Sequence, residues 1–323
     1  MTPSTLTDQE IASLAVSHNI IDLGVMADEL RRRLHGARTT FVRVAIVPLA
    51  GVTASWSSSA GEIRIVGTPG DRQSAIERIR AIVAQARGVP VSGFSLADLE
   101  RASAAEGATL RSLLEDFRAA GLELVADAAI DTLQDARRSI EEVNIAGLSL
   151  ARLSVDQLPS SDMPSFYKRV KELQRRVAVI HAFAPLPRKV NPALPTTGYD
   201  DVKRIALARL IVDNVASIQV DWSLYGPKLA QVALTVGADD VDGVSPDEDA
   251  DEGRRRTPLA EIRRNIRAAG HEPVERNGRF EMIDGPPEGG PRVRTGEGPA
   301  AASASDAAAS LAEAERRGKV DAT

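Results

Sequence analysis

The sequence predicts an α/β protein, and a TIM-like (β/α)8 barrel, complete or incomplete, fits it best. Short apolar runs alternate with amphipathic helical stretches between residues 41 and 245, and the number of such units is near eight. The run Phe41 to Val47 is β-branched or apolar on nearly every residue, which is typical of a parallel strand covered on both faces. An open doubly wound sheet is the alternative, but the chain has no GxGxxG or GxxxxGK[ST] loop to favour it.

The elements follow in order from the amino terminus. Thr7 and Glu10 have the spacing of a capping box that begins a first helix, and a second helix ends at Gly36. After the strand at 41–47, helices are predicted at 71–88, 95–107, 109–121, 130–143, 162–176 and 199–215. Strands are predicted at 122–128, 145–155, 177–186 and 217–222.

These elements predict four regions along the chain. Residues 1–40 form a helical segment, 41–245 the barrel core, and 246–285 an extension packed on the barrel. Residues 286–323 are rich in Gly, Pro, Ala and Ser and lack the apolar side chains that offset chain entropy, so we expect a disordered tail.

Composition excludes several kinds of protein. The chain has no cysteine, so it supplies neither disulfides nor thiolate ligands for zinc or iron–sulfur clusters. The net charge is −5 and no basic stripe with interleaved aromatics occurs, so nucleic acid is not an expected partner. No secretory signal and no run of eighteen apolar residues is found, so we expect a cytoplasmic protein that does not enter a membrane.

The stretch VALTVGADDVDG, Val232 to Gly243, carries three aspartates. The apolar spacing before Gly237 predicts the end of a helix, and ADDVDG then forms the last barrel strand. Residues at the carboxyl ends of barrel strands line the active-site mouth, so Asp242 is the main candidate for substrate binding, with Asp240 beside it. The alternative is that these carboxylates only fill a turn or cap backbone amides.

Two further residues are candidates for substrate binding. Trp222 is expected at the end of the preceding strand, where it borders the mouth or packs in the core. His181 lies near the end of a predicted strand, where it faces the mouth or has a structural role. No pair of histidines, and no histidine with a carboxylate, has metal-ligand spacing, so no metal or cofactor ligand is predicted.

The segment Arg204 to Gly243 resembles the carboxyl-terminal part of a radical S-adenosylmethionine family. This family includes aminofutalosine synthase, dehypoxanthine futalosine cyclase and the tyrosine-using subunit of FO synthase. GADDVDG and the later IRAAGHEPVERN, Ile266 to Asn277, most resemble aminofutalosine synthase of menaquinone biosynthesis. LGVMADELRRRLHGARTTFVR near the amino terminus and LPTTGYDDVKRIALARL are similar to the same family, whereas the middle is similar only loosely.

The resemblance implies a [4Fe–4S] cluster on a CxxxCxxC loop, with S-adenosylmethionine bound to it. Here the corresponding residues, Ile46 to Glu62, contain neither Cys nor His, and hydroxyl groups are poor ligands for such a cluster. The family's glycine-rich turn is replaced by LVADAAID, Leu124 to Asp131, and Gly147 to Ser165 has no Tyr-Gly-His end. The scaffold is thus similar, and the parts that hold the cofactor differ.

Two classes of function follow from the resemblance. The first is a catalytically silent pseudoenzyme that binds a small molecule or forms a hetero-oligomer with a cysteine-bearing paralogue. The second is an enzyme of the aminofutalosine synthase type with altered chemistry that uses no cluster of its own. A neighbouring gene with the cysteine motif would favour the first class.

Overall fold

The computed structural model describes residues 6–51, 55–157, 162–189, 197–247 and 259–283. The residues up to Ile283 belong to one compact unit, which contains every element described below. The predicted tail at 286–323 and part of the predicted extension lie outside the described residues.

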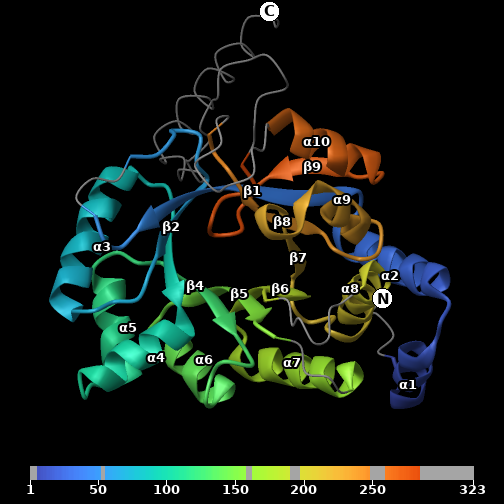
Figure 1. Cartoon of the computed structure of the whole chain (residues 1–323), viewed down its shortest axis with the longest axis horizontal. Helices are drawn as coiled ribbons and strands as arrows, with labels where there is room; N and C mark the ends of the chain where they lie inside the picture. The colour runs from blue at the N-terminus through green and yellow to red at the C-terminus, as the bar shows by residue number, and fades with distance from the viewer. Residues whose placement is uncertain (1–5, 52–54, 158–161, 190–196, 248–258, 284–323) are drawn as a thin grey trace, which may run out of the picture. The chain divides into compact units, whose positions relative to one another are not determined.

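The strands form a closed parallel barrel, which confirms the predicted fold class (Figure 1). The strands from β2 to β8 pair in chain order, and β1 pairs with both β8 and β2, which closes the ring. They are β1 (Arg38–Pro48), β2 (Glu62–Val66), β3 (Val91–Ser95), β4 (Leu124–Ala129), β5 (Ser149–Val155), β6 (Ile180–Pro187), β7 (Ser217–Asp221), β8 (Asp240–Val244) and β9 (Glu272–Glu275).

Helices lie around the outside of the barrel (Figure 1). Most bury an apolar stripe against the strands or against a neighbouring helix, as amphipathic helices of this fold do. They are α1 (Asp8–Val16), α2 (Ile20–His35), α3 (Arg72–Ala86), α4 (Leu96–Ala105), α5 (Leu110–Ala119), α6 (Ala136–Ile145), α7 (Met163–Val177), α8 (Gly198–Ile211), α9 (Trp222–Leu234) and α10 (Leu259–Ala268). The capping box predicted at Thr7 and Glu10 begins α1.

Strand β9 shares one edge of β1 with β2. The carboxyl half of β1 pairs with β2, from Val44 opposite Glu62 onward, whereas its amino half pairs with β9, from Arg38 opposite Glu272 onward. The chain after β9 then runs past the amino ends of β2 and β3. The Gly278 amide donates to the carbonyl of Gly61, the residue directly before β2, at 3.0 Å. Residues 276–283 therefore form a floor at the amino ends of the strands.

Glycine is required where this floor passes β2. A Cβ atom at Gly278 would lie 2.9 Å from Cγ of Glu62 and 3.1 Å from Cβ of Pro90. Those contacts are closer than van der Waals distance, so a larger residue would push the floor away from the barrel.

Strands β2, β3 and β9 and helix α10 were not predicted from the sequence. The β2 sequence EIRIV alternates charged and apolar residues, which is typical of a half-exposed strand. In the barrel, Glu62 and Arg64 are nevertheless buried, at 1% and 9% exposure. Their burial depends on partners on other strands, which the local sequence does not reveal.

His271 joins the start of β9 to β1. Its Nδ1 lies 2.9 Å from the Thr39 hydroxyl, and its Nε2 lies 3.6 Å from a carboxylate oxygen of Asp28 on α2. Burial, reinforced by the nearby positive charge of Arg31, lowers the pKa of His271 to about 4. The folded protein therefore holds this imidazole neutral at pH 7.

A pH titration of stability is expected to reveal this neutral histidine. The unfolded chain takes up the proton near its ordinary pKa of about 6.5, and the folded chain resists until about 4, so stability falls as pH drops through this window. The urea midpoint of His271→Gln should fall less steeply than that of the wild type between these values. Parallel curves for the two proteins would contradict the assignment.

Candidate functional site

Buried charged side chains of several strands form ion pairs that cross the inside of the barrel. Arg64 on β2 donates two hydrogen bonds to the Asp242 carboxylate on β8, both at 2.9 Å, and its Nε donates to Glu62 at 2.8 Å. Arg152 on β5 donates from Nη1 to the same Asp242 and from Nε to Asp127 on β4 at 2.9 Å. These contacts cross the barrel from β2 and β5 to β8.

Asp242 is therefore an internal counter-ion. It is 1% exposed and is the middle residue of β8, so it does not end the strand as predicted, but it pairs across the sheet with Asp221, the last residue of β7. Burial alone would raise the pKa of Asp242, but the charges of Arg64 and Arg152 outweigh burial and hold that pKa well below its ordinary value. The carboxylate stays ionised with both oxygens engaged.

The other two aspartates of this stretch also pair with specific arginines. Asp240 accepts two hydrogen bonds from Arg276, both at 2.7 Å, and one from Gln219 at 2.7 Å. Asp239 accepts from Arg209 and from the backbone amide of Ile218. All three carboxylates are buried and pair with arginine side chains, which neither alternative predicted, and only Asp239 also accepts from a backbone amide.

His181 lies at the opposite end of the barrel from the mouth. It is the second residue of β6, so it sits at the amino end of that strand, and of the two predicted alternatives it does not take the one that faces the mouth. Its ring stacks on Phe280 of the floor, with centroids 4.8 Å apart and planes 8° apart. On the other side, the Arg276 guanidinium lies 3.8 Å from the Phe280 centroid. Arginine, phenylalanine and histidine thus form one stack.

Trp222 is the first residue of α9, directly after β7. It is 2% exposed and belongs to the main hydrophobic core, and no hydrogen-bond partner is found for its buried Nε1 among the described residues. Sequence reasoning placed it correctly beside the strand end. Binding of a substrate by Trp222, Asp242, Asp240 or His181 stays a prediction.

The mouth itself carries residues that the sequence did not single out. Asp221 ends β7 and accepts from the Leu224 amide at 3.0 Å, which begins α9. Arg188 follows β6, and its guanidinium lies 3.8 Å from Asp221. Burial would raise the pKa of Asp127, but the charges of Arg152 and Arg188 outweigh it and lower that pKa. The signal available in the sequence was the position of each residue at or near a strand end.

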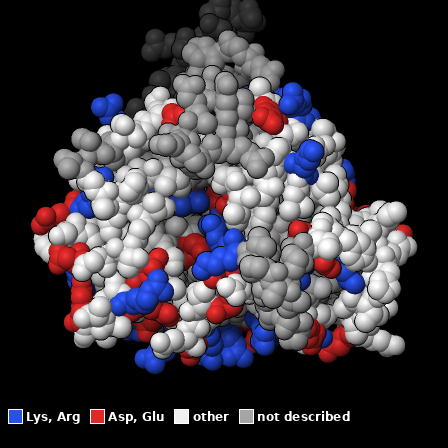
Figure 2. All heavy atoms as spheres, in the orientation of Figure 1, with Lys and Arg blue, Asp and Glu red and all other residues white. Residues whose placement is uncertain are grey.

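Gly243 allows β8 to pass close to this mouth. Its φ is +72°, and a Cβ atom there would lie 2.6 Å from Oδ1 of Asp221. Glycine adopts this backbone without strain, and its missing Cβ leaves room for the carboxylate. In the space-filling view, acidic and basic side chains lie side by side in a hollow near the middle of the face (Figure 2).

The loop between β1 and β2 does not fit an iron–sulfur cluster. Its described residues include Ser57 and Ser59, whose hydroxyls lie 2.9 Å apart, and Ser59 donates to the Pro246 carbonyl at 2.7 Å. The chain contains no cysteine, and thiolates are the ligands such clusters require. Within the described residues, no group of three or more acidic or histidine side chains has the geometry of a metal site.

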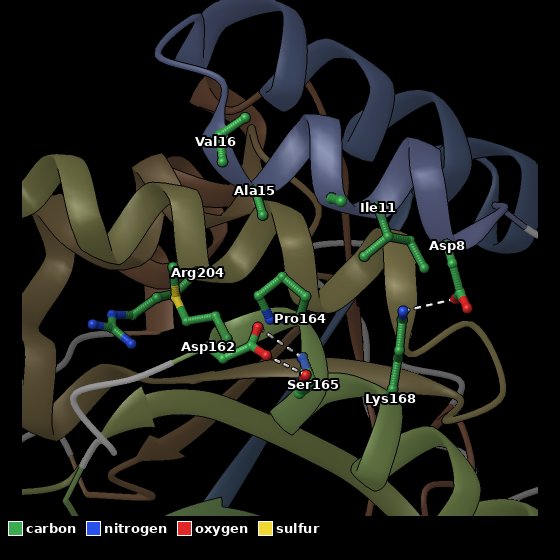
Figure 3. A pocket seen from close by; sticks show the side chains of 11 residues that line it. Asp8, Ile11, Ala15, Val16, Asp162, Pro164, Ser165, Lys168 and Arg204 are labelled. Atoms are coloured by element: carbon green, nitrogen blue, oxygen red, sulfur yellow. Dashed lines mark hydrogen bonds and ion pairs between the residues drawn. The ribbon is translucent and has the colours of Figure 1, made fainter.

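A separate groove of about 550 Å³ lies on the outer surface, between α1 and the start of α7 (Figure 3). Several of its polar groups bind one another: Lys168 pairs with Asp8 at 2.7 Å, and Asp162 accepts from the Ser165 amide at 3.3 Å. None of the predicted site residues lines it.

Among the helices that the structure describes, none has both the length and the apolar character needed to span a bilayer.

Comparison with known proteins places this barrel among its relatives. The sequence family described as the CofH/MqnC C-terminal region matches residues 186–288, from the end of β6 through the floor. A 5-amino-6-(D-ribitylamino)uracil–L-tyrosine 4-hydroxyphenyl transferase of Methanospirillum hungatei is 28% identical over 62% of this chain and 63% of its own length. Aminodeoxyfutalosine synthase of Thermus thermophilus is 25% identical over 64% of each protein.

The chain is similar to these proteins. This confirms the resemblance found in the sequence, and the chain spans less than two thirds of the length of either relative. The structure of methylornithine synthase is similar to this chain at 14% identity with a TM-score of 0.60, over 84% of this chain and 95% of that one. That likeness shows the barrel fold.

Proposed function

We propose that this chain is a catalytically silent relative of aminodeoxyfutalosine synthase. In this proposal it is a cytoplasmic pseudoenzyme of menaquinone biosynthesis that acts as a partner subunit or as a binder of a small molecule. The names of relatives support the pathway, because they include aminodeoxyfutalosine synthase and cyclic dehypoxanthine futalosine synthase. No S-adenosylmethionine cleavage is assigned to the chain.

One observation carries the proposal. The aspartate at the centre of the family-like GADDVDG stretch binds two arginines of its own barrel, Arg64 and Arg152, and the cofactor loop offers hydroxyls where thiolates are needed. Two buried guanidinium groups and their counter-ions occupy the barrel interior and keep its charges paired. A charged cofactor that entered this interior would have to compete with these internal ion pairs.

As a partner subunit, the chain would form a hetero-oligomer with a cysteine-bearing paralogue that performs the radical step. The cysteine-free sequence supports this form of the proposal, because a radical step would need a cluster held by thiolates of another chain.

Deleting the gene from its own organism tests the link to menaquinone. We expect the cellular menaquinone content, measured by mass spectrometry, to fall and to recover when the wild-type gene is returned on a plasmid. A strain that keeps its menaquinone after the deletion would contradict the proposal.

A further inference from the structure

Asn277 and Gly278 in the floor form the only asparagine–glycine pair of the sequence. In such a pair the backbone nitrogen of the glycine can attack the side-chain carbonyl carbon of the asparagine, because glycine has no side chain to hinder the approach. Each other asparagine precedes isoleucine, valine or proline, so the nitrogen beside it is crowded or fully substituted. Asn277 is therefore the asparagine of this chain with the greatest intrinsic tendency to lose its amide group.

The closed floor restrains the attacking nitrogen. Gly278 is buried, and its amide donates to the Gly61 carbonyl at 3.0 Å. The attack requires this nitrogen to lose its proton and with it this hydrogen bond, which leaves a buried carbonyl without a partner. The nitrogen is thus held back for as long as the floor lies against the start of β2.

The side chain of Asn277 is restrained as well. Its Oδ1 accepts from the backbone amides of Arg279 and Glu281, at 2.8 and 3.0 Å. Its Nδ2 donates to the Glu281 carboxylate at 2.8 Å. These three hydrogen bonds fix the amide in one orientation, and the last of them is lost when Nδ2 leaves.

Both restraints depend on the floor remaining in place. The residue before Asn277, Arg276, holds the floor through two hydrogen bonds to Asp240 and through its stack on Phe280. Short segments of this kind open locally at a lower free energy than the barrel unfolds. Such an opening frees the Gly278 nitrogen and the Asn277 side chain together.

We propose that Asn277 is a site of spontaneous deamidation, which the closed floor suppresses and the open floor permits. The Gly278 nitrogen forms a bond to Cγ of Asn277 and gives its proton to water, while the Cγ–Nδ2 bond breaks and ammonia leaves. Water then opens the resulting succinimide to aspartate or isoaspartate, and neither an oxidant nor a reductant takes part.

The products are expected to keep the floor open. Each places a carboxylate where the amide of Asn277 donated to Glu281, so two like charges face each other. Isoaspartate also adds a carbon atom to the backbone inside the turn that Arg276 and Met282 close by pairing antiparallel. The reaction therefore converts a reversible opening into a permanent one, and this inference does not depend on the proposed function.

Incubation of the whole protein in buffer and in urea, at one pH and temperature, tests the site. Cleavage after glutamate releases residues 276–281, and mass spectrometry measures the fraction in which the amide has become an acid. We expect the folded chain to deamidate at least about tenfold more slowly than the chain in urea. Equal rates in the two solutions, or no reaction of Asn277 in urea, would overturn the proposal.

Arg276→Ala tests the role of the floor, because it removes the stack and both hydrogen bonds to Asp240. Its folded form should deamidate several-fold faster than the folded wild type, each rate being divided by the rate of the same variant in urea. Arg279→Ala is the matched control, since Arg279 pairs with Glu123 at the surface, and its relative rate should equal that of the wild type. An unchanged relative rate in Arg276→Ala contradicts the proposal.

Asn277→Asp reproduces one product of the reaction in a chain of known composition. We expect trypsin to cleave this variant after Arg279 several-fold faster than the wild type, because the floor is open for longer. Glu281→Gln in the same chain should restore most of the resistance, since glutamine is uncharged and donates to the new carboxylate. Equal cleavage of Asn277→Asp and the wild type would show that deamidation does not open the floor.

Discussion

Asp242→Ala is expected to lower the free energy of unfolding by roughly 3–5 kcal/mol, because it leaves Arg64 and Arg152 buried without their shared counter-ion. Loss of a simple helix cap costs about 0.5–2 kcal/mol, so the size of the effect separates the two roles. Urea unfolding followed by circular dichroism measures it. Asp71→Ala is the matched control, since Asp71 is the exposed N-cap of α3.

The same substitution in a variant that already lacks Arg152 gives a second test. In Arg152→Met, one of the two cations is already absent, so the additional cost of Asp242→Ala should be smaller than in the wild type. If the cost of losing Asp242 is no larger than that of Asp71, or is the same in both backgrounds, the interior ion pairs do not contribute as described.

Arg276→Ala is expected to have the next largest effect. Arg276 is 2% exposed, donates twice to Asp240 and stacks on Phe280, so its loss leaves a buried carboxylate and a loose floor. We expect a loss of roughly 3–5 kcal/mol in unfolding free energy and faster proteolysis of residues 276–283.

The control for this prediction lies three residues away. Arg279 donates to Glu123 at 2.5 and 2.8 Å, but both side chains are more than a third exposed. Exposed pairs contribute about 0–1 kcal/mol, so Arg279→Ala should unfold close to the wild type. Similar losses in the two variants would show that the Arg276 stack does not hold the floor.

The sequence predicted the barrel because its most informative strands are apolar on both faces. Strand β1 begins three residues before the predicted Phe41, and β6 and β7 lie within or next to the stretches expected for them. Strand β2 was missed because Glu62 and Arg64 resemble residues of an exposed face. Arg64 is buried only because Asp242, 178 positions later, meets it across the barrel.

The candidate site was predicted less well for the same reason. Periodicity assigned Asp242 to the last strand, but whether its carboxylate faces a ligand or an arginine depends on pairings between distant strands. His181 was placed near a strand end, and the direction of the strand decides that it faces the floor. Asp127 and Asp221 gave no signal of their own, since their surroundings depend on where β4 and β7 lie in the closed barrel.

The central claim is that this barrel performs no radical chemistry of its own. The most direct measurement is anaerobic incubation of the purified chain with iron, sulfide, a low-potential reductant and S-adenosylmethionine, followed by assay of bound iron and of 5′-deoxyadenosine. We expect no stoichiometric iron, no visible absorbance of an iron–sulfur cluster, and no 5′-deoxyadenosine above a protein-free control. Stoichiometric iron together with catalytic formation of 5′-deoxyadenosine would contradict it.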